Sequence, residues 1–292
     1  DSGAAMAAAA AAEVDAGSAP QGACAALSDV QVTVTVDGVL VEPSAVKSDS
    51  CRVRLAAGDH AIELKFDNEA RQVGTGGRLW GASLHLARWV FANRELLRGR
   101  RVLELACGQA LPSLVAACCG AAEVLATDVV PSVLDLVRKN AARNGQKDCV
   151  RVAPLDLSAA GGILGAGVGS WDFVLFADCV YFQGMGEDLL RATRMLLRHD
   201  SGLAVGVLPG RGIRAGLTSF YEALAAGPAS ELRAEVSPVS TAEDLTWDVK
   251  DLLLQLVCLR VDPGGATCKD GPDARSESSE DGRWEQLSDL FS

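Results

Sequence analysis

The residues best suited to chemistry lie at 102–112, in the segment VLELACGQALP. An apolar run typical of a buried strand enters a turn of small residues, and a helix follows from about Pro112. Such a turn presents free backbone N–H groups to a ligand at the carboxyl end of a sheet. Asp128 ends the next apolar run, twenty residues after Gly108, where a carboxylate can accept both hydrogen bonds of a ribose diol. The spacing predicts a site for a nucleotide-like cofactor, and the alternative is that Asp128 only caps the helix near Pro131.

The elements that must position this turn follow from an alternation of strand-like and helix-like segments. Strand patterns occur at residues 101–106, 123–127, 150–153, 173–177, 203–208, 232–236 and 252–261, and helical patterns follow residue 80 and occur from about 112 and at 131–144, 187–198 and 217–225. This predicts an α/β fold with a Rossmann-like, mostly parallel sheet covered by helices on both faces. Residues 237–250 read as a loop, so we expect the last two strands to pair antiparallel at the sheet edge.

The segments that flank this α/β core have different patterns. Residues 29–67 alternate between apolar and polar, as in VTVTV at 32–36, which predicts antiparallel strands or hairpins. The Ala-rich start lacks apolar periodicity and the end is rich in Gly, Pro, Ser and acids, so neither can bury enough surface to fold. We therefore divide the chain into a disordered segment at 1–28, a β-hairpin extension at 29–73, an α/β domain at 74–261 and an acidic disordered tail at 262–292.

The net charge of −11 is concentrated in the two ends of the chain. Residues 1–30 carry −4 and residues 262–292 carry −5, which leaves −2 for the middle. A nearly neutral middle lacks the cationic stripe that binds phosphates, so we expect a basic protein segment rather than a nucleic acid as the principal partner. No stretch approaches the ~20 apolar residues of a membrane helix, so no membrane is expected as a partner.

The cysteines and the first basic residue indicate the compartment. No Lys or Arg precedes Lys47, which removes the cationic region of a secretory signal and the Arg-rich face of a mitochondrial presequence. The nine cysteines include the neighbours Cys118 and Cys119 and lack the spacing of a disulfide framework. We therefore expect a reducing compartment, the cytoplasm or the nucleus. No C-x-x-C pattern occurs and the three histidines are far apart in sequence, so no metal site is expected.

Four segments, taken in order, resemble the motifs of methyltransferase family 16, the seven-β-strand S-adenosylmethionine-dependent enzymes that methylate lysines of non-histone proteins. They are GTGGRLWGAS at 74–83, the segment at 102–112, Asp128, and DFVLFADCVY at 172–181. The resemblance covers roughly residues 74–260 and implies S-adenosylmethionine as the cofactor and a protein substrate that presents a lysine. It makes 74–261 a methyltransferase domain with seven strands, the last of them antiparallel. We expect this protein to be a monomer.

The resemblance also implies roles for single residues. In such enzymes the cofactor contacts would be made by Trp80 from above, Glu104 and Gly108 at the methionine end, Asp128 at the ribose, Asp156 near the adenine, and Ala177 by packing. The motif at 178–181 would line the entry of the target lysine, which makes Asp178 and Tyr181 the candidate catalytic residues. The structural alternatives are that Trp80 and Tyr181 are core residues and that Asp178 caps a turn.

The chain departs from the family pattern in and after the cofactor turn. The usual turn is G-x-G-x-G, but Ala106 and Ala110 replace the outer glycines. Their methyl groups disfavour the positive φ angles and the close backbone approach that such a turn uses. Leu157 follows Asp156 where the family often has a tryptophan, which removes a stacking face. The two alanines leave a catalytically weak, methyltransferase-like protein-binding module as an alternative function.

Methyl transfer to a lysine requires a deprotonated amine that is held in line with the donor and shielded from water. A free lysine has a pKa of ~10.4, so a lowering of at least ~3 units must come from desolvation and from repulsion by the sulfonium. Asp178 is suited to orienting the ammonium or taking its proton, and Tyr181 to hydrogen bonding or a cation–π wall. Transfer to a histidine or a small molecule is a further alternative.

A glycine pattern at 210–216 lies between a predicted strand and a predicted helix. Gly210, Gly212 and Gly216 imitate a dinucleotide fingerprint. Pro209 and the arginines of this segment favour a loop on the substrate side of the site instead.

Overall fold

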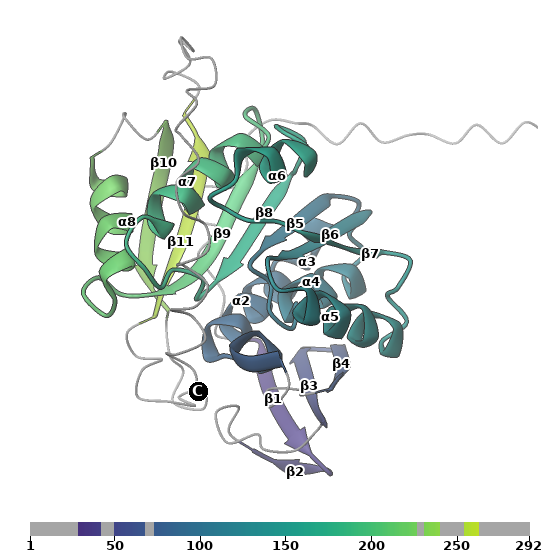
Figure 1. Cartoon of the computed structure of the whole chain (residues 1–292). Helices are drawn as coiled ribbons and strands as arrows, with labels where there is room; N and C mark the ends of the chain where they lie inside the picture. Colours follow the sequence, from purple (N-terminus) through teal and green to yellow (C-terminus); the bar gives the residue numbers. More distant parts are fainter. Residues whose placement is uncertain (1–28, 42–49, 68–72, 227–230, 240–253, 263–292) are drawn as a thin grey trace, which may run out of the picture.

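The computed structural model describes residues 29–41, 50–67, 73–226, 231–239 and 254–262, and Figure 1 shows their arrangement. The expectations for residues 1–28, for the tail beyond Asp262 and for most of the predicted loop at 237–250 lie outside these described residues. The described strands form a four-stranded and a seven-stranded sheet. The larger sheet carries the predicted cofactor turn, and the smaller one precedes it in the chain.

The smaller sheet is antiparallel and has the strand order β2-β1-β3-β4. Successive side chains of a strand point to opposite faces, so Val53 and Leu55 are buried while their neighbours Arg52 and Arg54 are exposed. The predicted antiparallel strands are thus confirmed for this region. The strands are β1 (Gln31–Val36), β2 (Val39–Leu40), β3 (Ser50–Ala57) and β4 (His60–Asp67).

The larger sheet has the strand order β10-β11-β9-β8-β5-β6-β7. Its members are β5 (Arg101–Leu105), β6 (Glu123–Asp128), β7 (Val150–Pro154), β8 (Phe173–Ala177), β9 (Leu203–Pro209), β10 (Leu232–Pro238) and β11 (Leu254–Val261). Strands β5 to β9 pair in parallel, and β11 is antiparallel to both β9 and β10. The predicted fold class is therefore confirmed, with seven strands and an antiparallel last strand.

Helices cover both faces of this sheet (Figure 1). On one face, α2 (Gly81–Ala92), α4 (Leu111–Cys118) and α5 (Pro131–Arg143) contribute to a hydrophobic cluster that also includes the smaller sheet. On the other face, α6 (Ala160–Gly165), α7 (Met185–Leu196) and α8 (Ala215–Ala225) pack on a second cluster. The short η2 (Gly74–Gly77) precedes α2, and α3 (Arg94–Leu97) follows it. In the described part of the chain, no helix is long and apolar enough to cross a membrane.

Helix α6 is not predicted by the sequence pattern. Its sequence is AGGILG, and glycine inside a helix costs about 1 kcal/mol relative to alanine. Ile163 is its only buried residue, and this side chain joins the cluster that also holds buried residues of α7. Tertiary packing of that one side chain therefore overrides a weak local preference.

Polar side chains in the last turn and at the C-cap of α5 attach the smaller sheet in addition to the shared apolar core. Asn140 Oδ1 accepts a hydrogen bond from the Asp67 N–H at 2.9 Å. The side chain of Asn144 accepts from the Lys65 N–H and donates to the Lys65 carbonyl, both at 2.8 Å. Arg143 pairs with the Asp67 carboxylate at 2.8 Å. The domain boundary proposed near residue 74 stays a prediction. The β-strand region before it and the α/β region after it share one hydrophobic core.

A glycine in the middle of the larger sheet makes room for a phenylalanine. Gly206 of β9 and Phe176 of β8 are cross-strand partners. A Cβ atom at position 206 would lie 1.9 Å from the Phe176 ring. That ring is fully buried, with 0% exposure, so it has no free space to move into.

We therefore expect Gly206→Ala to destabilise the fold by about 1–3 kcal/mol, the usual cost of overpacking a core. Thermal unfolding followed by circular dichroism should show a melting temperature several degrees below wild type. Gly161→Ala is the matched control, because a Cβ at position 161 meets no atom within 4 Å, and its melting temperature should be equal or higher. A Gly206→Ala variant as stable as wild type would contradict this account of the β8–β9 pairing.

Candidate active site

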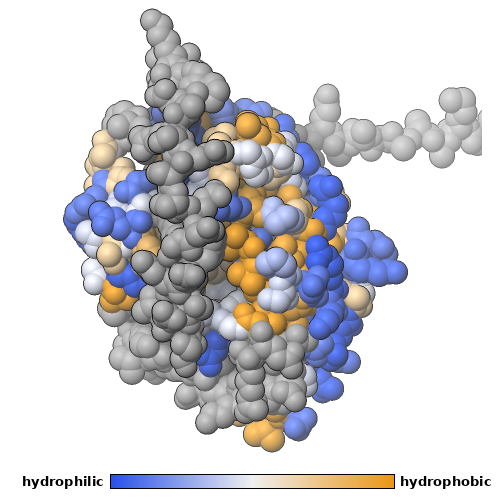
Figure 2. Space-filling model, in the orientation of Figure 1, coloured by the Kyte–Doolittle hydropathy of each residue, from blue (hydrophilic) through white to orange (hydrophobic). Residues whose placement is uncertain are grey.

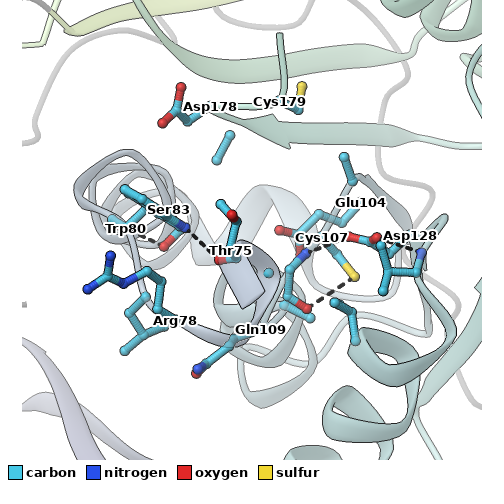
Figure 3. Close-up of a pocket in the computed structure, with 18 of the residues that line it drawn as sticks. Thr75, Arg78, Trp80, Ser83, Glu104, Cys107, Gln109, Asp128, Asp178 and Cys179 are labelled. Carbon is cyan, nitrogen blue, oxygen red and sulfur yellow. Dashed lines mark hydrogen bonds between the residues drawn. The ribbon is translucent and has the colours of Figure 1, made fainter. Parts of the chain in front are cut away.

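A pocket opens at the carboxyl ends of β5, β6 and β8. The cavity measures about 580 Å³, within the ~300–1,000 Å³ typical of small-molecule sites. Figure 3 shows its walls: η2 and the start of α2 lie on one side, the turns after β5 and β6 on another, and Asp178 with Cys179 across from them. Since β6 and β8 flank β5, the pocket lies where the strand order reverses, the usual ligand position in open α/β sheets.

Apolar side chains form much of the pocket wall. Figure 2 shows apolar surface near the middle of this view, beside the grey atoms, with hydrophilic residues along its right-hand side. A wall of this kind excludes water and suits a flat heteroaromatic ring. The apolar residues that line the cavity include Leu79, Leu111, Val130, Val133 and Met185.

In the turn after β5, every second residue from 106 to 110 has a positive φ angle. Ala106, Gly108 and Ala110 have φ angles of 49°, 51° and 56°. The two alanines therefore do adopt the backbone conformation that glycine favours, at a cost of roughly 1–2 kcal/mol each. Hydrogen bonds hold the turn, because the Cys107 N–H donates to the Thr127 carbonyl at 2.8 Å and the Ala110 N–H to the Cys107 carbonyl at 2.7 Å.

Asp128 joins this turn to the end of β6. One carboxylate oxygen accepts from the Gly108 N–H and the other from the Val130 N–H, both at 3.1 Å. The side chain lines the cavity and the residue is 8% exposed. Burial raises the pKa of Asp128, although the backbone N–H groups act against the rise. Asp128 therefore orders the chain just before α5, whose N-cap is Val130. It also faces the cavity, and each of its oxygens has a further lone pair for a ligand hydroxyl.

Glu104 is a second carboxyl group on the same side of the cavity. It is 1% exposed and lines the pocket at the end of β5. One of its oxygens accepts from both the N–H and the hydroxyl of Ser113, at 2.9 and 2.5 Å. Burial raises the pKa of Glu104 to about 8, against the effect of these hydrogen bonds. In the absence of a nearby cation the group is therefore mostly protonated at neutral pH.

Trp80 lies at the pocket wall and not in the core. It is half-buried and lines the cavity. Its indole Nε1 donates to the Thr75 carbonyl at 3.0 Å, and the Arg78 guanidinium lies 5.2 Å from the ring centroid. Thr75 lies in η2 and Trp80 caps α2, so this bond fixes the ring between the two helices. The structural alternative, in which Trp80 is a plain core residue, is therefore not supported.

The predicted acceptor residues reach the cavity from the segment after β8. Ala177 ends that strand, and Ala177, Asp178 and Tyr181 all line the pocket. Asp178 has a φ of 44° and donates its N–H to the Val207 carbonyl at 2.9 Å. Burial raises the pKa of Asp178 and that of Tyr181.

A partner of Asp178 that the sequence analysis does not single out is Arg214, at the start of α8. Its guanidinium donates to both carboxylate oxygens of Asp178, at 2.6 and 3.2 Å, and lies 4.7 Å from the centroid of the Tyr181 ring. The Gly- and Arg-rich loop at 210–216, predicted to lie on the substrate side, is the signal that pointed to this region. The sequence could not say which arginine reaches the motif.

Asp156 is not among the described residues that line the cavity. It follows β7, and its carboxylate accepts hydrogen bonds from the N–H and the hydroxyl of Ser158 at 2.8 and 2.7 Å. Trp171 does not replace the stacking face missing at Leu157, because its ring is fully buried and its Nε1 donates to the Ala166 carbonyl at 2.9 Å. The structure therefore brings together every predicted site residue except Asp156.

Comparison with known proteins shows which family this chain matches. The family described as lysine methyltransferase matches residues 59–212. A protein-lysine N-methyltransferase, EFM3, from Chaetomium thermophilum is 31% identical over 138 residues, which are 45% of this chain and 41% of that protein. The electron transfer flavoprotein beta subunit lysine methyltransferase of Xenopus laevis is 31% identical over 133 residues, 45% of this chain and 51% of that protein. This chain therefore spans about half the length, or less, of these two relatives.

A third relative and one solved structure agree with this result. The protein N-lysine methyltransferase METTL21A of Danio rerio is 29% identical over 170 residues, 55% of this chain and 72% of that protein. A putative SAM-dependent methyltransferase from Streptococcus mutans superposes with a TM-score of 0.50 at 15% identity, over 72% of this chain and 55% of that one. At that identity the structure supports the fold alone. Because the family match at 59–212 spans more than half of the 292 residues and includes all the parallel strands from β5 to β9, this chain belongs to the lysine methyltransferase family.

Proposed function

We propose that this chain is an S-adenosylmethionine-dependent protein-lysine N-methyltransferase that acts on a non-histone protein. The observation that carries the proposal is one cavity with two distinct walls, Glu104 and Asp128 on one and Asp178 and Tyr181 on the other. Membership of the lysine methyltransferase family and the names of the relatives support it. A monomeric state and a cytoplasmic or nuclear location remain predictions.

The residues of the pocket fit S-adenosylmethionine. This molecule combines a cationic sulfonium and ammonium, a ribose diol and an adenine ring. Glu104 and Asp128 offer carboxyl groups to the cationic and hydroxyl parts, and the apolar wall with Trp80 at its edge suits the ring. When bound, it supplies the methyl group that an acceptor nitrogen takes by in-line displacement.

The acceptor lysine would enter beside Asp178 and Tyr181. The carboxylate can accept a hydrogen bond from the amine and so direct its lone pair into the cavity, while the Tyr181 ring forms a wall for the aliphatic stem. Most of the lining groups around them are apolar, which keeps water from competing for the methyl group and favours an uncharged amine.

Transfer of a radiolabelled methyl group tests the proposed function. The purified chain is incubated with labelled S-adenosylmethionine and a cell lysate, and labelled proteins are hydrolysed to amino acids. We expect the label in methylated lysine. Label in methylhistidine or in a small molecule would contradict the lysine assignment and support the alternative acceptors.

A second candidate function is a methyltransferase-like module that binds proteins without catalysis. The observation that favours it is the backbone strain at Ala106 and Ala110, both at positive φ in the turn that faces the cofactor. The turn nevertheless keeps its hydrogen bonds to Thr127 and Asp128, which supports a functional site. Calorimetric titration with S-adenosylmethionine separates the two, since a module of this kind would show no binding.

Asp128→Ala should weaken S-adenosylmethionine binding. Loss of hydrogen bonds to a charged group removes about 1.5–3 kcal/mol, which corresponds to roughly 10- to 150-fold in Kd. Asp135→Ala on the exposed side of α5 is the control, and its affinity should match wild type. Calorimetry gives the affinities, and thermal melting shows whether each variant is folded. A folded Asp128→Ala variant with wild-type affinity would rule out the ribose contact.

Glu104 should make the stability of the ligand-free protein depend on pH. Its pKa is about 8 in the folded state and near ~4.3 in an unfolded chain. The contribution of Glu104 to the free energy of unfolding is therefore complete below the pKa of the unfolded chain. This contribution is lost as pH rises towards 8, and the free energy of unfolding then falls by at most ~1.4 kcal/mol per pH unit.

Glu104→Gln removes this titration, so its stability relative to wild type should rise steadily from pH 5 to pH 8. Urea unfolding at several pH values measures the difference. The control is Glu95→Gln, whose side chain is 68% exposed, and its curve should stay parallel to wild type. Parallel curves for Glu104→Gln as well would show that Glu104 is ionised in the folded protein.

Asp178→Ala and Tyr181 variants should separate methyl transfer from cofactor binding. We expect Asp178→Ala to lose ~10²-fold or more in single-turnover methyl transfer, the scale of a group that positions or deprotonates the amine. S-Adenosylmethionine affinity should stay within a few-fold of wild type, because Asp128 and the turn after β5 remain. Tyr181→Phe should be less impaired than Tyr181→Ala if the ring wall matters more than the hydroxyl. Wild-type rates in both Ala variants would make these residues structural.

A further inference from the structure

The carboxylate that faces the acceptor side of the cavity is already paired with a cation. Arg214 donates to both oxygens of Asp178, in the two-point geometry that suits guanidinium and carboxylate. The Asp178 side chain is 13% exposed and that of Arg214 is 30% exposed. Burial alone would lower the pKa of Arg214, but its hydrogen bond to Asp178 raises it. Burial raises the pKa of Asp178, and the hydrogen bond and charge of Arg214 act against that rise. The two-point contact is that of an ion pair, in which the two charges cancel.

Backbone packing fixes the position of this pair. Gly216, in the first turn of α8, lies against the segment that follows Tyr181. A Cβ at position 216 would lie 2.2 Å from the Phe182 carbonyl oxygen, so only glycine allows this approach. The Arg214 guanidinium also lies 4.7 Å from the Tyr181 ring centroid, within cation–π distance. The start of α8 is thus held against the predicted acceptor motif.

Arg214 approaches Asp178 and Tyr181 from outside the cavity. Among the described residues that line the pocket, Asp178 and Tyr181 are present and Arg214 is absent. An acceptor amine can therefore reach the carboxylate from the cavity without displacing the guanidinium. Each carboxylate oxygen keeps a lone pair for that contact, since the pair with Arg214 uses one on each.

We propose that Arg214 is a positioning residue of the acceptor site: its guanidinium holds the Asp178 carboxylate and cancels its charge, so that the site receives the acceptor lysine as a neutral amine. The inference rests on the proposed function and describes how the same site selects the reactive form of its substrate. An unpaired carboxylate would instead stabilise an ammonium ion, which has no lone pair to attack a methyl group.

Of the other titratable groups near the pair, Glu104 and Asp128 can carry negative charge, and both are present in every variant of the test. Burial raises the pKa of the Cys179 thiol and of the Tyr181 hydroxyl, which favours the neutral form of both. Glu104, with a pKa of about 8, changes charge near that pH, and does so in every variant of the test. The titratable and charged groups that line the cavity or contact the pair are Arg78, Glu104, Cys107, Asp128, Asp178, Cys179, Tyr181 and Arg214.

The test uses n-butylamine, which carries the primary amine of a lysine side chain with a pKa near ~10.4. Its affinity for the full chain saturated with S-adenosylhomocysteine is measured by nuclear magnetic resonance titration from pH 8 to pH 10. In wild type the apparent affinity, calculated from the total amine concentration, should rise at least ~10-fold from pH 8 to pH 10. The reason is that the fraction of amine in the neutral form increases by more than ~10-fold over this range. In Arg214→Gln it should change less than ~2-fold, because the ammonium ion remains the main species and becomes the bound form.

Three variants serve as controls. Arg214→Lys keeps the positive charge and should follow wild type. Arg211→Gln removes an arginine of the same loop whose exposed partner is Glu222, and it should also follow wild type. Asp178→Asn combined with Arg214→Gln removes both charges and should restore the wild-type rise with pH. Thermal melting of each variant checks that it is folded.

The outcomes below either overturn the inference or contradict the proposed function on which it rests. A wild-type affinity that does not rise with pH, or no amine binding at any pH, overturns the inference even if Arg214→Gln fails to fold. The same is true if Arg214→Gln keeps the wild-type rise, or if it binds the amine more tightly at every pH, which would mean that Arg214 blocks the acceptor site. A chain that does not bind S-adenosylhomocysteine would instead contradict the proposed function itself.

Discussion

The hydrogen bond from the Gly108 N–H to the Asp128 carboxylate, 3.1 Å long, is the contact on which the candidate site depends. It joins the turn after β5 to the end of β6, two strands that already pair in parallel. The same carboxylate accepts the Val130 N–H where α5 is about to begin. One side chain therefore fixes the turn, the strand end and the helix start, and these three elements form the cofactor side of the cavity.

The backbone around the cavity contains several residues with a positive φ angle. Ala106, Gly108 and Ala110 alternate into the left-handed region, and so does Asp178 after β8. For Ala106 and Ala110 this conformation is unfavourable, whereas glycine and aspartate tolerate it better. Strain of this kind persists only where surrounding contacts impose it, and it tends to gather at functional sites. Its concentration at the ends of two neighbouring strands supports the cavity as the place where the chain binds its ligands.

The sequence predicts those strands and site residues that can be recognised from a short local pattern. Parallel strands buried on both faces appear as continuous apolar runs, so β5, β6, β8 and β9 are predicted within one or two residues of their ends. Asp128 is found because its distance from the glycine turn is set within one strand–helix–strand unit.

Contacts between distant segments have no such signal. Asp178 and Arg214 are 36 residues apart and meet only because α8 packs against the segment after β8. Nothing in the local pattern distinguishes Arg214 from Arg211, which points instead to Glu222 at the surface. Asp156 shows the opposite case, since the family pattern suggests a site residue and the carboxylate binds its own neighbour Ser158.

The charges of the cavity differ between its two ends, and the proposed reaction explains why they should. The cofactor side holds Glu104 and Asp128, each buried and neither paired with a cationic side chain in the described residues. The acceptor side holds a carboxylate whose charge Arg214 cancels. A bound cationic donor favours the ionised form of the carboxyl groups beside it, including Glu104, whereas an acceptor amine must lose its proton before it can attack. A site with carboxylates free at both ends would bind two cations close together and hold the amine in its unreactive form.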